Sequence, residues 1–471
     1  MISRQRKWVW IVSLIAASLA PRFTSVQAAE PTKPNIVWIW SDNLGYGDLG
    51  CYGNTNIKTP HIDRLADQGV RLTQYYIAHA VCSPSRVAFI TGRQPFRSGF
   101  ASVIWPDSPV GLPEDEITMA EILREQGYAT GCIGKWHMGD RYSSLPLQNG
   151  FDRYFGIPYS MDMLPRHVYR DNEILGELRG EKLATITEQF TDEAIRFVEE
   201  NKKKPFFLYF SHTLPHPPIV LPERCRTPGR PIYYDALEHM DEQVGRLLEA
   251  LEKKGLTNNT LVILTSDNGP WQKPGSAGGL RGGIISNHEG GLRVPFIASW
   301  PGKIPAGKTV DTPSIVYDMF PTFVHLAGGT MPTDRVYDGQ DVWPLLTGNG
   351  EIKREKPFIW VGRFSGRNVS AVRDGRWKLQ IFELGPDEPK TGRWFMNENG
   401  KTFKLELYDL EKDEQESQDV AELYPDVVLN LRKVADELQA DIPFMWNVPY
   451  IVRDPAKLKS GAQKYLSPGK E

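Results

Sequence analysis

Four short apolar runs, each followed directly by polar residues, recur between residues 35 and 264. They cover residues 35–40, 129–133, 206–210 and 261–264. Each run is apolar at consecutive positions, as is typical of strands that are buried on both faces. Helical periodicity marks the intervening segments 118–126, 187–202 and 233–254. This alternation predicts an α/β fold, with a large, mostly parallel or mixed β-sheet flanked by helices on both faces.

The alternation of strands and helices ends near residue 345. Beyond it, residues 371–379 predict a hairpin that turns at Asp374 and Gly375, since an Asp-Gly pair favours a tight turn. Another strand is expected over residues 405–410 and a helix over residues 425–440. These elements predict a smaller C-terminal α+β domain with an antiparallel sheet.

The N-terminus has the parts of a signal peptide. Arg4, Arg6 and Lys7 form a basic start, residues 8–20 are apolar apart from serines, and small residues precede an expected cut after Ala28. The apolar run is short for a bilayer span, which needs ~20 residues. We therefore predict export to the periplasm or the extracellular space, without stable membrane insertion. The expected divisions are a signal peptide over residues 1–28, a large α/β domain over 29–345 and a small α+β domain over 346–471.

Composition is that of an ordinary soluble globular protein. Hydrophobic residues make up 40% and charged residues 24%, and the formal net charge is −3. No basic field suggests a nucleic-acid partner. Four cysteines in 471 residues are too few for a disulfide framework. The 13 tryptophans, 18 tyrosines and 20 phenylalanines could stack on sugars, although a large packed core accounts for them more simply.

Polar residues gather where the four predicted strands end. They are Asp42 and Asn43, Lys135 and His137, His216, and Asp267 and Asn268. Ligand sites in such folds form at the carboxyl ends of the strands, so we expect one shared site. Paired carboxylate and amide oxygens suit calcium or magnesium better than zinc or copper. An Asp-Asn pair can also form a turn or cap a helix, but two such pairs at one sheet edge favour a metal site.

The most specific motif begins at Cys82. Residues 82–86 read CSPSR, and Thr91, Gly92 and Arg93 follow. A cysteine ahead of a helix could be an activated thiolate or a buried structural residue. Together, however, the two motifs resemble the signature of the formylglycine-dependent, type I sulfatases of the alkaline phosphatase-like superfamily.

The resemblance extends over residues 34–430. Further matching segments are residues 41–48, 134–139, 215–217, 266–269 and 289–295. Residues 150–152 and 156–160 are similar to the arylsulfatase A branch in particular. The resemblance implies a sulfuric ester hydrolase that acts on a sulfated small molecule or glycan, most simply a sulfated carbohydrate, through a formylglycine–sulfate intermediate. The large domain would be the catalytic one.

The resemblance also implies the cofactors. A formylglycine-generating enzyme would oxidise Cys82 to formylglycine (3-oxoalanine). One calcium ion would be held by Asp42, Asn43, Asp267 and Asn268 together with the modified residue 82.

The resemblance assigns four further catalytic roles. Arg86 would steady the formylglycine hydroxyl, and Lys135 would contact both the formylglycine and the sulfate. His137 would take a proton so that sulfate leaves and the aldehyde returns, and His216 would protonate the leaving alkoxide. His212, beside His216, is a weaker candidate.

Two positions depart from the family's pattern. Asn43 stands where the family usually has a second aspartate, and Ile284 stands where it usually has a lysine that binds sulfate and assists the leaving group. Lys273 or His288 could replace that lysine.

Other open points concern the small domain and the function. Arg373, Arg376, Trp377 and Lys378 of the predicted hairpin could border the substrate cleft or form a solvated hairpin face. The two departures suggest a non-catalytic binder of sulfated glycans as one alternative, and the superfamily suggests a phosphate or phosphonate ester hydrolase as another. The complete motif at Cys82 disfavours the phosphate or phosphonate hydrolase. The non-catalytic binder is disfavoured because the chain retains all the expected catalytic residues, Cys82, Arg86, Lys135, His137 and His216.

Overall fold

The computed structural model describes residues 33–440 except for residues 272, 349, 351, 363–367, 386–387, 389–391 and 397–399. The predicted signal peptide lies outside the described residues. None of the described helices is long and apolar enough to cross a membrane. From Lys33 onward the chain forms one compact unit, and a domain boundary near residue 345 stays a prediction. All four cysteines are free thiols.

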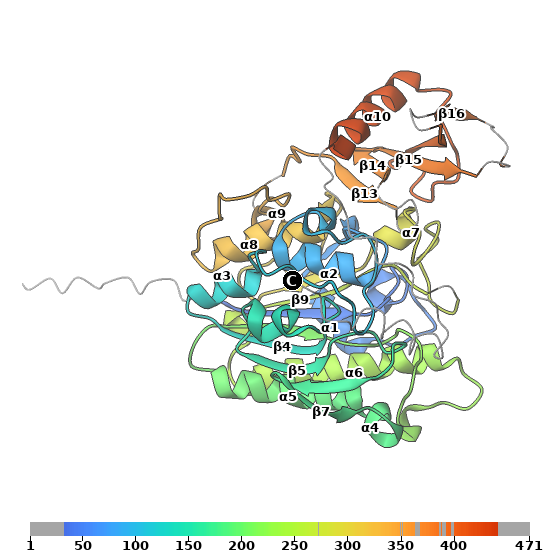
Figure 1. Cartoon of the computed structure of the whole chain (residues 1–471). Helices are drawn as coiled ribbons and strands as arrows, with labels where there is room; N and C mark the ends of the chain where they lie inside the picture. Colours follow the sequence, from blue (N-terminus) through green and yellow to red (C-terminus); the bar gives the residue numbers. More distant parts are fainter. Residues whose placement is uncertain are drawn as a thin grey trace, which may run out of the picture. The chain divides into compact units, whose positions relative to one another are not determined.

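A ten-stranded mixed sheet forms the centre of the large domain (Figure 1). Its order is β11-β2-β10-β9-β1-β8-β4-β5-β6-β7. The strands are β1 (Asn35–Ser41), β2 (Val70–Leu72), β4 (Ala129–Lys135), β5 (Arg153–Ile157), β6 (His167–Arg170), β7 (Glu173–Glu177), β8 (Phe206–Ser211), β9 (Thr260–Ser266), β10 (Phe296–Ser299) and β11 (Lys308–Val310). The central strands β9, β1, β8, β4 and β5 are parallel, and β10, β6 and β7 pair antiparallel. The predicted sheet is therefore confirmed.

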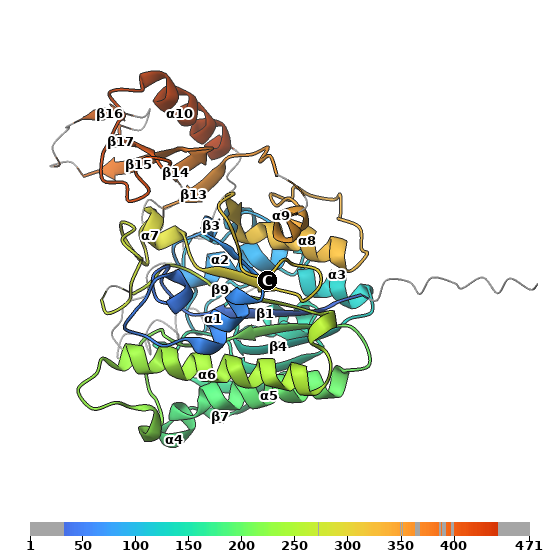
Figure 2. The same cartoon turned by 180° about the vertical axis from the view of Figure 1, so that it is seen from behind.

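Helices cover both faces of this sheet, as predicted (Figures 1 and 2). The helices are α1 (Pro60–Asp67), α2 (Cys82–Thr91), α3 (Met119–Glu125), α4 (Gly180–Ala184), α5 (Ile186–Asn201), α6 (Ile232–Lys253), α7 (Glu289–Leu292), α8 (Met319–Leu326) and α9 (Trp343–Thr347). A short two-stranded sheet pairs β3 (Tyr75–Tyr76) with β12 (Ser314–Ile315).

Strand β1 shows how one sequence builds two cores. Trp38 and its alternate neighbours pack with α2, α3 and α8, for example against Phe89 and Phe323. Val37 and Ile39 belong to the other core, formed with α1, α5 and α6. Because successive side chains of a strand point to opposite faces, a strand covered on both faces must be apolar throughout.

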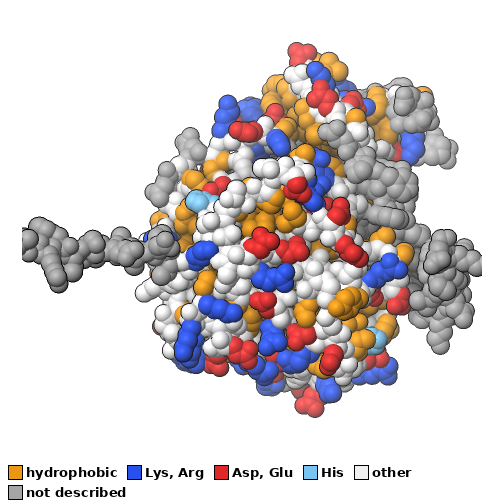
Figure 3. Space-filling model, turned by 60° about the vertical axis from the view of Figure 1, so that its left-hand side comes forward, with side chains coloured by type: hydrophobic (Ala, Val, Ile, Leu, Met, Phe, Trp, Pro, Cys, Tyr) orange, Lys and Arg blue, Asp and Glu red, His pale blue; other side chains and the backbone are white. Residues whose placement is uncertain are grey.

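The small domain is a five-stranded antiparallel sheet covered by α10 (Pro425–Ala440). Its order is β13-β14-β15-β17-β16, with β13 (Phe358–Val361), β14 (Val369–Asp374), β15 (Trp377–Leu384), β16 (Arg393–Met396) and β17 (Thr402–Asp409). The predicted hairpin is β14–β15, but it turns at Gly375 and Arg376, one residue later than expected, because Asp374 still pairs with Trp377 at the end of the ladder. Figure 3 shows one face of the whole molecule, and basic and acidic side chains are interspersed on this face.

Two charged residues of this hairpin lie in neither of the environments expected for them. Lys378 is fully buried, and its Nζ lies 2.8 Å from Glu289 Oε1 and 3.1 Å from Glu416 Oε1. Arg373 is also buried and donates hydrogen bonds to Gln74 and the Tyr76 hydroxyl. Sequence reasoning treated these charges as solvent-facing or cleft-lining, but they join the hairpin to α7 and β3 of the large domain.

The other two hairpin residues have local partners. Arg376 pairs with Asp409 and Glu411 of the small domain. The Trp377 ring lies 4.7 Å from that of Tyr424.

Replacement of Lys378 by methionine tests the buried charge cluster. The variant Lys378→Met leaves two buried carboxylates without their cation, and we expect the free energy of unfolding to fall by about 3–5 kcal/mol. Lys404→Met is the matched control, because Lys404 pairs with Glu406 at a partly exposed position of the same sheet and should cost less than ~1 kcal/mol. Urea denaturation measures the free energy of unfolding of both variants. Equally small decreases in the two variants would contradict a stabilising role for the buried charge cluster.

Candidate active site

The parallel strands bring the predicted site residues to one edge of the sheet. Ser41 of β1 is in register with Ser266 of β9, so that Asp42 and Asp267 follow at the same level. Cys82 begins α2 beside them. One donor atom each from Asp42, Cys82 and Asp267 lies within 4.8 Å of the others, and all three residues are buried. The sequence-predicted convergence is therefore observed for these residues.

Cys82 is buried rather than reactive as a free thiol. Its Sγ lies 3.7 Å from Asp42 Oδ1, and the side chain is 2% exposed. Burial raises the pKa of the Cys82 thiol well above its ordinary value, and the negative charge of Asp267 adds to the effect. An unmodified Cys82 is therefore protonated at neutral pH, which disfavours the activated-thiolate alternative.

Arg86 lies one helical turn after Cys82 and is fully buried. Its guanidinium donates to Asp267 Oδ2 from Nε at 3.0 Å and from Nη2 at 2.7 Å. Nη1 donates to the Lys135 carbonyl at 2.9 Å, to Ser211 Oγ at 2.7 Å and to the Tyr209 hydroxyl at 3.2 Å. One side chain of α2 thus contacts three strands of the sheet.

The sequence did not single out Tyr209 and Ser211. They alternate along β8, an arrangement that turns both side chains to the face covered by α2. The hydroxyl groups of Tyr209 and Ser211 could have suggested a polar role for these positions. The apolar residues around them instead favour the interpretation of a buried strand.

Lys135 forms the second buried ion pair of the site. Its Nζ lies 2.7 Å from Asp42 Oδ2, and both side chains are inaccessible to solvent. Burial opposes the charge of the lysine, but the negative groups around it, with the Asp42 carboxylate first, together outweigh burial and raise the pKa of Lys135. The ammonium group therefore keeps its proton inside the protein.

Ser160 joins Lys135 to His216. Its Oγ accepts a hydrogen bond from Lys135 Nζ at 3.2 Å and lies 3.4 Å from His216 Nε2. His216 Nδ1 lies 2.5 Å from the Pro217 carbonyl oxygen, so Nδ1 carries a proton. Ser160 ends the segment 156–160, which is similar to the arylsulfatase A branch, but no role was predicted for it.

His137 is buried and has one free ring nitrogen. Nε2 lies 3.1 Å from the Ile104 carbonyl oxygen, and Nδ1 has no hydrogen-bond partner among the described residues. Burial lowers the pKa of His137 well below its ordinary range, and the charges of Lys135 and Arg86 lower it further. The imidazole is therefore neutral, with Nδ1 able to accept a proton.

The two asparagines fit a hard cation. Asn268 Nδ2 donates to Asn43 Oδ1 at 2.6 Å, while the buried Asn268 Oδ1 has no partner in the part of the chain that the structure describes. A buried acceptor without a partner costs free energy, and a cation beside it would remove that cost. Burial opposes ionisation of Asp267, but Arg86 and Lys135 together lower the pKa of Asp267 and keep it a carboxylate. The donors are all oxygens except Cys82 Sγ.

The family model described as Sulfatase matches residues 34–329 of this chain. The chain belongs to the sulfatase family. Sulfatases hydrolyse sulfate esters and generally use a metal ion and a formylglycine, and this sulfatase is accordingly a sulfuric ester hydrolase.

Known relatives cover most of this sulfatase. Steryl-sulfatase of Rattus norvegicus is 37% identical to it, over 82% of this chain and 83% of the relative. Arylsulfatase A of Homo sapiens is 36% identical, over 85% and 87% of the two chains. The crystal structure of Ps i-CgsB in complex with k-i-k-neocarrahexaose has a TM-score of 0.77 and 29% identity, and the match covers 93% of this chain and 98% of that one.

The loop with the sulfatase's unusual Ile284 runs beside Cys82. The Ile284 N–H donates to the Pro270 carbonyl, and the Ile285 N–H donates to the Ala80 carbonyl, each at 2.9 Å. The loop at Ile284 therefore lies in space between the segment that follows β9 and the segment that leads into α2. The Ile284 side chain supplies no charge there.

The two candidate replacements for the missing lysine differ in surroundings. His288 packs against Phe382 of the small sheet, with ring centroids 5.8 Å apart. Burial, followed by the charges of Lys378 and Arg281, lowers the pKa of His288 to about 4. It is therefore neutral and supplies no cation at neutral pH.

Lys273 lies two residues after Trp271 in the sequence, and the ring centroids of Trp271 and His216 are 6.2 Å apart. It lines a cavity of about 700 Å³ together with Asn54 and Tyr234. Of the two, Lys273 is the one with an exposed side chain, and none of the other residues that line this cavity is a predicted site residue. His212 is fully buried, and neither of its ring nitrogens has a hydrogen-bond partner among the residues described, so its ring is not hydrogen-bonded to the site.

The serine between Lys135 and His216 can be tested directly. We expect Ser160→Ala to lower kcat/KM for a sulfate ester by about ten- to a hundredfold, because Lys135 and His216 lose their shared partner. Ser299→Ala is the control, since Ser299 of β10 is also buried and its hydroxyl donates to the Gln68 carbonyl after α1. Steady-state kinetics with an aryl sulfate gives the answer. Full activity in Ser160→Ala would show that the serine does not position these groups.

Proposed function

We propose that this exported enzyme removes sulfate from a sulfated carbohydrate, with Cys82 matured to formylglycine. The observation that supports the proposal most is the setting of Cys82 at the start of α2, enclosed by Asp42 and Asp267 and backed by the buried cations Arg86 and Lys135. A protonated, fully enclosed thiol is a poor nucleophile, so conversion gives this position its reactivity. A formylglycine-generating enzyme is the partner that this conversion requires.

A calcium ion is the cation we propose for the site. Asp42, Asn43, Asp267 and Asn268 would hold it together with the modified residue 82. The hard oxygens of these side chains are the ligands that calcium prefers, and the unpartnered Asn268 Oδ1 supports a cation there. Such an ion supplies a positive charge that polarises the sulfate ester and offsets the negative charge that develops as the S–O bond breaks.

Formylglycine supplies a hydrated aldehyde as the nucleophile, which permits covalent catalysis in two steps. Lys135 and Arg86 hold the negatively charged sulfate and the nucleophile in place through charge-assisted hydrogen bonds. His137 accepts a proton at Nδ1, its free nitrogen. His216, in its doubly protonated form, would donate the Nε2 proton to the leaving alkoxide and become the neutral ring, while the Nδ1–H stays bound to the Pro217 carbonyl.

The carbohydrate class of substrate rests on similarity. Ps i-CgsB is crystallised with k-i-k-neocarrahexaose, and its structure matches nearly the whole of this chain. The curated relatives include a steryl-sulfatase as well, so an assay panel should contain sulfated oligosaccharides, an aryl sulfate and a sterol sulfate. Periplasmic or extracellular location follows from the predicted cut after Ala28 and is part of the same proposal.

The decisive experiment on the mechanism is the variant Cys82→Ala. We expect kcat/KM to fall by at least about a thousandfold, because the variant has neither a thiol nor its aldehyde product. Cys51→Ala, at a half-buried cysteine outside the site, should keep wild-type activity. Intact-mass spectrometry of the wild type should show the loss of mass from thiol to aldehyde at residue 82. Full activity in Cys82→Ala would overturn the mechanism.

The same kinetic experiment separates the two alternatives. A protein that binds the sulfated sugars without turning any of them over would be a non-catalytic binder. Faster turnover of phosphate or phosphonate esters than of sulfate esters would identify the other hydrolase class.

The missing lysine at Ile284 gives a second prediction. We expect Lys273→Ala to lower kcat/KM by about ten- to a thousandfold, most for alkyl sulfates, because poor leaving groups need a cation or acid at the departing oxygen. His288→Ala should be near wild type, since His288 is neutral and packs on the small sheet.

His216→Ala completes the comparison. If Lys273→Ala is near wild type and His216→Ala is almost inactive, His216 alone protonates the leaving oxygen. Full activity of His216→Ala on an alkyl sulfate would contradict both accounts.

A further inference from the structure

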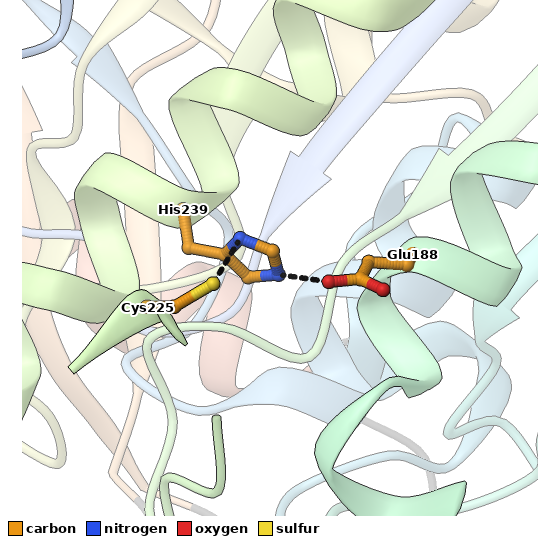
Figure 4. Close-up of side chains that lie close together, drawn as sticks. All are labelled: Glu188, Cys225 and His239. Atoms are coloured by element: carbon orange, nitrogen blue, oxygen red, sulfur yellow. Dashed lines mark hydrogen bonds and ion pairs between the residues drawn. The ribbon is translucent and has the colours of Figure 1, made fainter. Parts of the chain in front are cut away.

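A second cluster of metal-binding side chains lies on the other face of the large sheet. Glu188 is in the first turn of α5, His239 is in α6, and Cys225 ends the 3₁₀ turn Glu223–Cys225 (Figure 4). One donor atom from each of the three lies within 4.8 Å of the other two. Helices α5 and α6 pack against the face of the sheet opposite α2, so this cluster is separate from the site at Cys82.

The distances in this cluster are near those of a metal site. Cys225 Sγ lies 3.5 Å from His239 Nδ1, and Glu188 Oε1 lies 3.6 Å from His239 Nε2. Ligand atoms around a tetrahedral zinc ion, at bond lengths of about 2.0–2.3 Å, are roughly 3.3–3.7 Å apart. The two contacts use different ring nitrogens, so binding one ion needs a rotation of the Cys225 side chain toward Nε2. Cys225 and Glu188 are only partly buried and can make such adjustments.

The hydrogen bonding of His239 selects the nitrogen that would bind. Nδ1 faces Glu242 Oε2 at 3.3 Å, and this carboxylate fixes the ring proton on Nδ1. Nε2 is buried and has no hydrogen-bond partner in the described chain, and it points toward Glu188. A metal-binding histidine usually donates its other N–H to a carboxylate in this way. His239 is 3% exposed, and burial lowers its pKa, so the neutral ring is the form present.

One cation already occupies part of this environment. Arg224 pairs with Glu188 Oε1, although its side chain is 63% exposed. Arg224 and His239 Nε2 face the same oxygen of Glu188, Oε1. Because exposed ion pairs contribute little to stability, a metal ion can displace Arg224 from this oxygen. Arg224 therefore does not block the site.

We propose that His239 Nε2, Cys225 Sγ and Glu188 bind a zinc ion, with solvent in the fourth position. A thiolate, an imidazole and a carboxylate form a ligand set for zinc, whereas calcium and magnesium select oxygens alone. The protein would then carry two chemically distinct metal sites on opposite faces of one sheet. Because Cys225 lies in the loop that leads from His216 to α6, the ion would tie this loop to α5 and α6.

Cobalt binding tests the proposal, because a cobalt–thiolate bond produces an absorption band that oxygen ligands do not. The full mature chain with Cys82→Ala is used, so that the thiol near Asp42 and Asp267 contributes nothing. We expect about one equivalent of Co²⁺ per chain to produce the band and Zn²⁺ to displace it. Absence of the band in this protein would overturn the proposal.

Matched variants assign the ligands. Adding Cys225→Ala should abolish the band and weaken zinc binding at least about tenfold, whereas adding Cys51→Ala should leave both unchanged. Glu188→Gln, at a partly exposed position, should weaken zinc binding while the metal-free melting temperature stays that of the parent protein. Persistence of the band without Cys225 would refute the assignment.

Competition with calcium separates the two metal sites. Saturating Ca²⁺ should leave the zinc stoichiometry unchanged, because calcium does not compete for thiolate and imidazole ligands. Release of zinc by calcium would show that the ion lies among the oxygens near Asp42, and the second site would be rejected. None of these results depends on sulfatase activity.

Discussion

The buried ion pair between Arg86 and Asp267 is the interaction on which the rest of the site depends. Both side chains are inaccessible to solvent, so each charge would cost several kcal/mol without the other. The pair ties the first turns of α2 to β9, and the remaining donors of Arg86 reach β4 and β8. The residue that follows β9 and the residue that begins α2 are therefore fixed relative to each other before any substrate binds.

Charge balance explains how such a site can exist inside a protein. Lys135 and Arg86 offset Asp42 and Asp267, and each pair is held by a bond of 2.7 Å. Asn43 and Ile284 are uncharged at the two positions where the resemblance leads us to expect an aspartate and a lysine, so the site would lack one charge of each sign. One hydrogen bond joins the two amides, from Asn268 Nδ2 to Asn43 Oδ1, and it leaves Asn268 Oδ1 without a partner among the described residues.

The parts of the structure that the sequence predicted share a physical cause. Continuous apolar runs identify strands buried on both faces, and their shared polar ends identified the edge where Asp42 and Asp267 meet. Tyr209 and Ser211 lie within an apolar run, and sequence analysis did not predict their contacts with Arg86. A strand that is simply buried and a strand that contributes hydroxyl groups to a site have the same apolar pattern. Lys378 was misread for the opposite reason: charge in a hairpin suggests solvent, and only the fold brings Glu289 to it.

The small domain reaches the active site through that same contact. Glu289 begins α7 directly after the loop that contains Ile284 and Ile285, and Lys378 binds its carboxylate. The Ile285 N–H bonds to the Ala80 carbonyl, two positions before Cys82. A short chain of backbone and charged contacts therefore runs from the hairpin of the small domain to the start of α2. Because buried ion pairs and backbone hydrogen bonds resist distortion, the small sheet acts as a fixed support for the loop that lies beside the segment leading to Cys82.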